Sequence, residues 1–97
     1  MITQQDALNS LKKFKAEASS KYGIVSLGIF GSVARNQASE GSDLDVVVET
    51  ERVNPFQLVH LKSELEQLLG VRVDLIRQRE RMNEFLRKQI ERDAIYV

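Results

Sequence analysis

Cysteine is absent from the 97-residue chain, and histidine occurs only once, at His60. Disulfides, thiolate nucleophiles and cysteine-based metal sites are therefore excluded, as is a zinc site built from several histidines. No apolar run approaches the ~20 residues of a membrane-spanning helix. The polar start MITQQDALNS also differs from a secretory signal. We therefore expect a cytoplasmic protein without a membrane segment.

An excess of positive charge is also missing, because 14 lysines and arginines balance 14 aspartates and glutamates. Proteins that bind nucleic acids nonspecifically carry a basic excess, so direct nucleic-acid binding is not expected. The charges are nevertheless spread unevenly, and residues 24–76 contain eight acids against four basic residues. Acids that gather on a fold often hold a cation, which directs attention to this central region.

The hydrophobic pattern is that of a globular chain, with 42% apolar and 29% charged residues. Apolar positions three or four apart predict amphipathic helices, and short runs rich in β-branched residues predict buried strands. Helices are predicted over 4–20, just after 30, from Asn54-Pro55 to Gly70, and around 82–90. Strands are predicted over 24–30, 44–49 and 71–76, and an apolar tail follows at 95–97.

The alternation of strands and helices predicts an α/β (α+β) fold, in which helices flank a small mixed sheet of at least three strands. The 21-residue connection between the strands at 44–49 and 71–76 contains a helix, so a parallel crossover is sterically allowed. The sequence leaves open whether the first two strands run parallel or antiparallel. A chain of this length suits one domain, residues 1–97.

Carboxylates on strands are the most informative feature of the sequence. Asp43 and Asp45 lie two positions apart, so their side chains share one face of a strand, with Cα atoms about 6.6 Å apart. If the strands at 44–49 and 71–76 are neighbours, Asp74 stands beside Asp45. Three such carboxylates repel one another unless cations lie among them, and oxygen ligands favour Mg²⁺ or Mn²⁺. Two ions about 3.5–4 Å apart would suit phosphoryl or nucleotidyl transfer.

A second feature follows the first strand, where Gly31-Ser32 opens a polar stretch. Glycine allows the backbone to approach a ligand closely. A serine at a helix start offers its hydroxyl beside unbonded backbone N–H groups, which together suit an anion. Arg35 lies three residues further on, on the same side of such a helix as Ser32. A phosphate grip and a carboxylate site would thus flank one cleft.

Each of these side chains also has a purely structural interpretation. Asp43 fits a turn, and Asp74 fits a surface ion pair with Arg72. Ser32 fits a simple helix cap, and Arg35 fits a solvated surface charge. These alternatives stay open at the level of the sequence.

The spacing of these residues resembles a known family. Gly31-Ser32, ten intervening residues and then Asp43-Leu44-Asp45 resemble the signature of the polymerase-β-type nucleotidyltransferases. The run GSVAR…SDLDVVV, followed by VDLI and a C-terminal helix, is similar to the minimal, MNT-type members, over nearly the whole chain. The family pattern has glycine after the arginine, whereas this chain has Asn36. Asparagine tolerates left-handed backbone, so a small effect on the turn is expected.

The resemblance implies a role for each matching residue. Asp43, Asp45 and Asp74 would be catalytic ligands of two Mg²⁺ ions, or of Mn²⁺, with Asp74 as the alternative general base. The loop residues Gly31 and Ser32, with Arg35, would bind the triphosphate of ATP.

The resemblance also implies a partner. MNT-type relatives act as antitoxins of HEPN-type ribonuclease toxins and attach AMP from ATP to a toxin tyrosine, so a homo- or hetero-oligomer is expected. Two other functions stay open: AMP transfer to a small molecule such as an aminoglycoside, and toxin binding without catalysis. A chain this short leaves little structure to enclose a small acceptor, which favours a protein acceptor.

Overall fold

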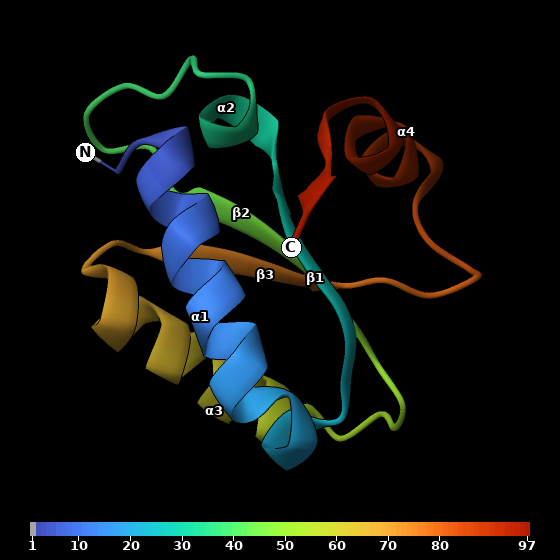
Figure 1. The fold of residues 1–97 in the computed structure, drawn as a ribbon. Helices are drawn as coiled ribbons and strands as arrows, with labels where there is room; N and C mark the ends of the chain where they lie inside the picture. The colour runs from blue at the N-terminus through green and yellow to red at the C-terminus, as the bar shows by residue number, and fades with distance from the viewer. Residues whose placement is uncertain (1) are drawn as a thin grey trace.

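The computed structural model describes residues 2–97, within which four helices surround a four-stranded sheet (Figure 1). The helices are α1 (Gln4–Tyr22), α2 (Gly31–Ala34), α3 (Pro55–Leu69) and α4 (Glu84–Asp93). The strands are β1 (Ile24–Phe30), β2 (Leu44–Thr50), β3 (Val73–Arg77) and β4 (Ile95–Tyr96). The expected α/β architecture with a mixed sheet flanked by helices is confirmed.

Capping residues set the ends of the long helices. The Thr3 side chain accepts a hydrogen bond from the Asp6 N–H at the start of α1, and Gly23 ends that helix with a φ of 63°. Asn54 caps α3 in the same way, ahead of Pro55, whose fixed φ suits a first helical turn. Gly70 ends α3 with a φ of 68°. Glycine accepts such left-handed geometry without steric cost, so these helix ends follow from the sequence.

The sheet has the strand order β3-β2-β1-β4. β1 pairs antiparallel with β2, which answers the question that the sequence leaves open. β2 pairs parallel with β3 through the crossover helix α3, as a connection long enough to contain a helix allows. β4 pairs antiparallel with the free edge of β1. The two central strands therefore place the residues after β1 next to the residues before and within β2.

The two faces of the sheet are covered differently. α1 and α3 pack on one face, where Leu11 and Leu61 are fully buried against Leu44, Val46 and Val48 of β2. On the other face, α4 contributes Ile90 to a smaller buried cluster. That cluster includes Phe30 of β1 and Val47 of β2. Because side chains alternate along a strand, odd-numbered residues of β2 face α4.

The structure corrects two predicted boundaries. The third strand begins at Val73 rather than at 71, where the Glu66 carboxylate of α3 accepts the Val73 N–H at 2.9 Å. The last helix begins at Glu84, because Asn83 caps it and leaves Met82 outside.

The apolar tail at 95–97 contains β4, a strand that the sequence analysis missed. A Cβ on Gly28 of β1 would lie 2.6 Å from the Ile95 carbonyl oxygen, so the glycine lets this strand approach. Within residues 2–97, none of the helices has the length and apolar character needed to cross a membrane.

Candidate active site

The three predicted carboxylates gather at the start of β2 and β3. Asp45 is the direct register partner of Asp74 in the parallel pair. Asp45 lies on the same strand face as Val47, and Asp74 lies on the same face as Ile76. Val47 and Ile76 belong to the apolar cluster that packs on α4. Asp43, two residues before Asp45, is more exposed and influences Asp45 electrostatically. The structure therefore places Asp45 and Asp74 side by side on the α4 side of the sheet, with Asp43 just before the start of β2.

Asp45 is the acid of this group whose pKa is raised most clearly by its surroundings. Partial burial, followed by the charges of Asp74 and then Asp43, raises the pKa of Asp45 from 3.8 to about 6. The charge of Arg35 acts in the opposite direction and lowers this pKa. The group thus has more negative charge than its protein neighbours compensate, which is the condition that favours a bound cation.

The loop after β1 lies against the same carboxylate. Phe30, the last residue of β1, is the register partner of Asp45, so Gly31 is placed at its side. Gly31 has a φ of 73°, and a Cβ at this position would collide with Oδ2 of Asp45. Only glycine combines this left-handed backbone with such a close approach. The start of the Gly31-Ser32 loop therefore lies beside Asp45.

Ser32 lies in the first turn of α2, a helix of four residues. The residue at the N-cap position is Phe30, and this helix start has no side-chain cap in the described structure. The simple capping interpretation of Ser32 is therefore wrong. Its partly buried side chain lies in the turn that follows the close approach of Gly31 to Asp45.

Arg35 directly follows α2, and its side chain is 38% exposed but also forms an ion pair. Its Nη1 lies 2.9 Å from Oδ2 of Asp93, a buried carboxylate at the end of α4. Arg92 also binds Asp93, with both of its bonds within 3.0 Å. The sequence analysis missed Asp93. The available signal was its position, since an acid in the last turn of a helix opposes the helix dipole and calls for a cationic partner.

Two further expectations concern neighbouring residues. Arg72 pairs with Asp43 at 3.5 Å, and not with Asp74, so the proposed Arg72–Asp74 surface pair is wrong. Both partners of the Arg72–Asp43 pair are substantially exposed, which makes the pair weak. Asn36 has a φ of 58°, as expected for the residue that replaces the glycine of the family pattern.

The acidic side chains are candidate ligands for a metal ion. Among residues 2–97, no three Asp, Glu or His side chains converge closely enough to hold a metal ion as they stand. Asp43 is turned toward Arg72 through its exposed ion pair. The donor chemistry nevertheless fits, because Asp45 and Asp74 are register partners and Asp43 lies two residues before Asp45, so three carboxylates occur at one end of these strands. A hard divalent cation with oxygen ligands suits this set.

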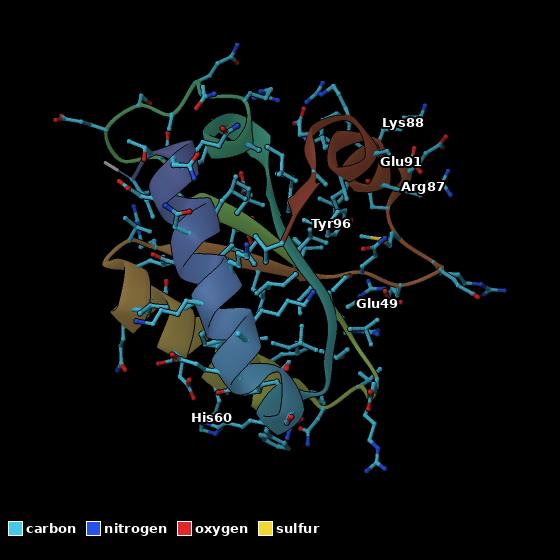
Figure 2. The ribbon with its side chains drawn as sticks, in the orientation of Figure 1. Glu49, His60, Arg87, Lys88, Glu91 and Tyr96 are labelled. Carbon is cyan, nitrogen blue, oxygen red and sulfur yellow. The ribbon has the colours of Figure 1, made fainter. Side chains whose placement is uncertain are left out.

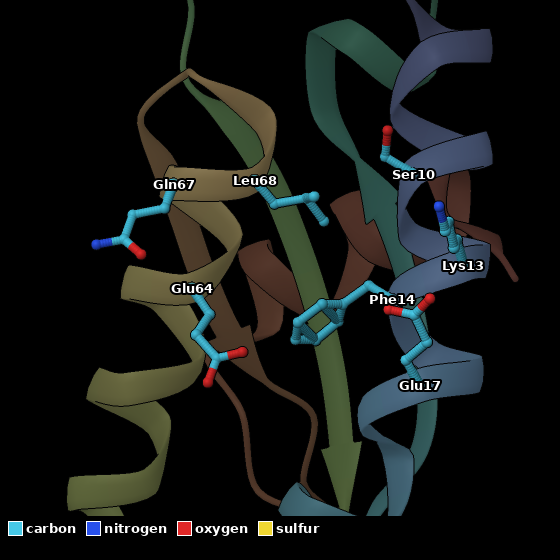
Figure 3. A pocket seen from close by; sticks show the side chains of 7 residues that line it. All are labelled: Ser10, Lys13, Phe14, Glu17, Glu64, Gln67 and Leu68. Carbon is cyan, nitrogen blue, oxygen red and sulfur yellow. The ribbon is translucent and has the colours of Figure 1, made fainter.

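Two hollows flank different parts of the fold. A cleft of about 720 Å³ lies between α1 and α3, where Phe14 and Leu68 face each other (Figure 3). This cleft is on the side of the sheet opposite the acids. A smaller hollow of about 210 Å³ borders Asp43, the Ser39–Ser42 turn and Arg72. His60 is exposed on α3 and points away from the sheet (Figure 2), as expected for a residue outside the site.

Comparison with known proteins identifies the family. Residues 11–97 match the nucleotidyltransferase domain family. The chain is 38% identical over 98 residues to MJ0126 of Methanocaldococcus jannaschii, named as a candidate protein adenylyltransferase, with 100% of both chains covered. It is 33% identical over 98 residues to the protein adenylyltransferase MntA of Thermococcus cleftensis, covering 100% of this chain and 98% of that protein.

A solved complex supports the fold independently. It contains a tri-AMPylated Shewanella oneidensis HEPN toxin with its MNT antitoxin, and it matches with a TM-score of 0.70 and 20% identity. The match covers 97% of this chain and 71% of that chain. With the family match spanning the glycine loop, the three acids and Arg35, the chain belongs to the nucleotidyltransferase domain family and is a nucleotidyltransferase.

Proposed function

We propose that this enzyme transfers AMP from ATP to a tyrosine hydroxyl of a HEPN-type toxin and so acts as its antitoxin. The observation that carries the proposal is the register of Asp45 with Asp74 beside the Gly31 loop. This arrangement sets a carboxylate group next to a backbone segment that can approach phosphates. The names of the full-length relatives support protein adenylylation, and the solved toxin–antitoxin complex supports the class of partner.

The proposed metal ligands are Asp43, Asp45 and Asp74. When bound, Mg²⁺ or Mn²⁺ would offset charge on the triphosphate and on the leaving pyrophosphate. Loading requires Asp43 to exchange its weak, exposed contact with Arg72 for the ion. It also requires Asp45 to be ionised, which its raised pKa opposes below about pH 6.

The protein groups have separate tasks in the proposed reaction. The Gly31 backbone and the Ser32 hydroxyl bind triphosphate oxygens, and Arg35 adds a positive charge beside them. The acceptor oxygen attacks the α-phosphorus, and the bond from that phosphorus to the bridging oxygen of pyrophosphate breaks. Asp74, the more exposed of the paired carboxylates, accepts the hydroxyl proton or serves only as a ligand. Catalysis then rests mainly on positioning and electrostatics.

A protein acceptor suits the geometry of the site. Asp43 and Asp74 are exposed, so the site is open to the surface on their side. A chain of 97 residues leaves little further structure to enclose both a nucleotide and a small acceptor. A partner chain would supply the missing side of the site, so we propose a hetero-oligomer with the toxin.

The direct test incubates the purified protein with labelled ATP, Mg²⁺ and the protein encoded by the adjacent gene. We expect label on a tyrosine of that partner, its loss when Mg²⁺ is chelated, and reduced ribonuclease activity of the labelled partner. Label on an aminoglycoside and on no protein would instead establish a small-molecule adenylyltransferase. A stable complex without any label would establish a binding module.

A further inference from the structure

Asp93 is the single buried charged residue among residues 2–97, with its side chain 3% exposed. It is the last residue of α4, where unbonded carbonyl groups already create negative potential. A buried acid at this end of a helix is costly unless cations surround it. Two arginine side chains pair with Asp93, and one of them, Arg35, belongs to the candidate active site.

Two arginines bind this one carboxylate. Arg92 is the neighbouring residue, and its Nε and Nη2 lie 2.9 and 3.0 Å from the two Asp93 oxygens. Arg35, 58 positions away in sequence, adds a single bond from Nη1 to Oδ2 at 2.9 Å. These contacts, led by the Arg92 hydrogen bonds, keep the pKa of Asp93 below its ordinary value. The positive charge of Arg92 already balances the negative charge of Asp93. With Arg35 included, the three side chains carry one net positive charge.

The surplus charge lies on the side of the catalytic acids. The backbone N–H of Arg35 donates to the carbonyl of Gly31 at 3.1 Å, and Gly31 is the residue that lies against Asp45. Arg35 follows α2, the turn that begins with the Gly31-Ser32 loop. Its bond to Asp93 uses one guanidinium nitrogen, whereas Arg92 uses two. Arg35 is thus fixed at one nitrogen between a buried anchor and the proposed phosphate loop.

We propose that Asp93 is a positioning residue for the nucleotide: it fixes the Arg35 guanidinium so that the remaining N–H groups bind the triphosphate. The inference rests on the proposed function, because it assigns the nucleotide as the ligand of Arg35. A preoriented arginine loses less side-chain freedom on binding than a mobile one, and this gain appears in ATP affinity. The end of α4 thereby becomes part of the nucleotide site without touching the reacting atoms.

The test compares Asp93→Asn with Glu91→Gln, which removes an equal charge from an exposed position of the same helix. ATP affinity is measured by calorimetry without acceptor, and KM and kcat are measured with the partner. We expect Asp93→Asn to weaken ATP binding about tenfold, with a rise in KM larger than the fall in kcat. Glu91→Gln is expected to change neither quantity, and Asp93→Glu to restore part of the affinity.

A double-mutant cycle separates positioning from a structural role. If Asp93 acts through Arg35, then Asp93→Asn costs less than twofold in ATP affinity once Arg35→Met is present, while any effect on thermal stability persists. Equal costs in both backgrounds would overturn the inference, as would wild-type affinity in a folded Asp93→Asn.

If no Asp93 variant folds, Arg35→Met alone still tests the inference. Arg35→Met leaves Asp93 paired with Arg92, and unchanged ATP affinity in that variant overturns the inference. Failure of the proposed function has a different signature, in which the wild-type protein itself neither binds ATP nor labels its partner.

Discussion

The two faces of the sheet differ in what their side chains do: one face forms the main apolar core, and the other presents the acidic residues. On the α1 and α3 side, alternate residues of β2 are leucine and valine with no exposed surface, and they belong to the larger buried cluster. On the α4 side, the same strand presents Asp45, Val47 and Glu49, and only Val47 is fully buried. Burial of apolar side chains on the α1 and α3 face therefore stabilises the fold. On the α4 face, partial burial of the Asp45 carboxylate opposes its ionisation.

This difference between the faces explains how so short a chain accommodates a reactive site. The large cluster on one face stabilises the strands, so their register no longer depends on the residues of the other face. Asp45 and Asp74 can then repel each other at adjacent register positions without separating the strands. Substitutions on the two faces should consequently separate activity from stability.

The largest expected effect comes from the acidic face. In Asp43→Ala with Asp45→Ala, partner labelling should fall by at least about 10³-fold, since the electrostatic support of the transition state is lost. The fold should persist, because the change removes repelling charges and no core volume. Labelling assays and circular dichroism check both points. Glu49→Gln, on the same strand and face, is the matched control and should keep activity; an active double variant would refute the carboxylate site.

The apolar face should show the opposite behaviour. Leu61→Ala removes a fully buried side chain of α3 and should cost about 2–5 kcal/mol of unfolding free energy. Phe56→Ala changes a 79% exposed residue of the same helix and should cost less than about 0.5 kcal/mol. Denaturant unfolding measures both values. A Leu61→Ala protein as stable as Phe56→Ala would contradict the division between the faces.

Gly31 should affect both stability and activity, because its backbone is left-handed and it lies against Asp45. Gly31→Ala should cost about 1–3 kcal/mol of stability and at least tenfold in ATP affinity, because of left-handed backbone and the collision with Asp45. Gly41→Ala is the matched control, since Gly41 has a φ of 82° but no atom within 4 Å of an added Cβ. Thermal unfolding and nucleotide titration should show a smaller loss for Gly41→Ala. Equal losses would show that the close approach to Asp45 has no effect.

The smallest effect concerns the pH dependence of stability. The pKa of Asp45 is raised from 3.8 to about 6, so the folded protein binds a proton more readily than the unfolded chain between these values. Its stability therefore falls as pH rises through this window. An asparagine at this position does not ionise, so the Asp45→Asn variant should not lose this stability. At pH 8 it should be more stable than the wild-type protein by about 1 kcal/mol, the value for a partly solvated group.

The gain from Asp45→Asn should vanish as the pH falls toward 4, which thermal melts across pH 4–8 can follow. Added Mg²⁺ should raise the melting temperature of the wild-type protein more than that of the variant. A constant difference between the two proteins at all pH values would contradict the assigned pKa of Asp45.

Features with local causes could be predicted from the sequence. The ends of α1 and α3 follow from Thr3, Gly23, Asn54 and Gly70, and alternation along β2 places Asp45 on the face opposite Leu44. The pairing of Asp45 with Asp74 was predicted only on the condition that their strands are neighbours. That condition depends on packing between distant segments.

Features that depend on long-range contacts could not be predicted. The bond between Arg35 and Asp93 joins residues 58 positions apart, and no periodicity links them. β4 is two residues long, and only the close approach permitted by Gly28 makes it a strand. The direction of β1 against β2 likewise needed the structure, because a connection of 13 residues allows either arrangement.

The parallel register of β2 and β3 makes the chain unequally tolerant of changes in length. Loss of one residue between Gly70 and Val73 would slide β3 by a single step and turn Asp74 toward the leucines of α3, because strand side chains alternate. Extra residues between Glu51 and Asn54, at the far end of β2, would leave that register intact. Tags and inserted domains belong in the second segment.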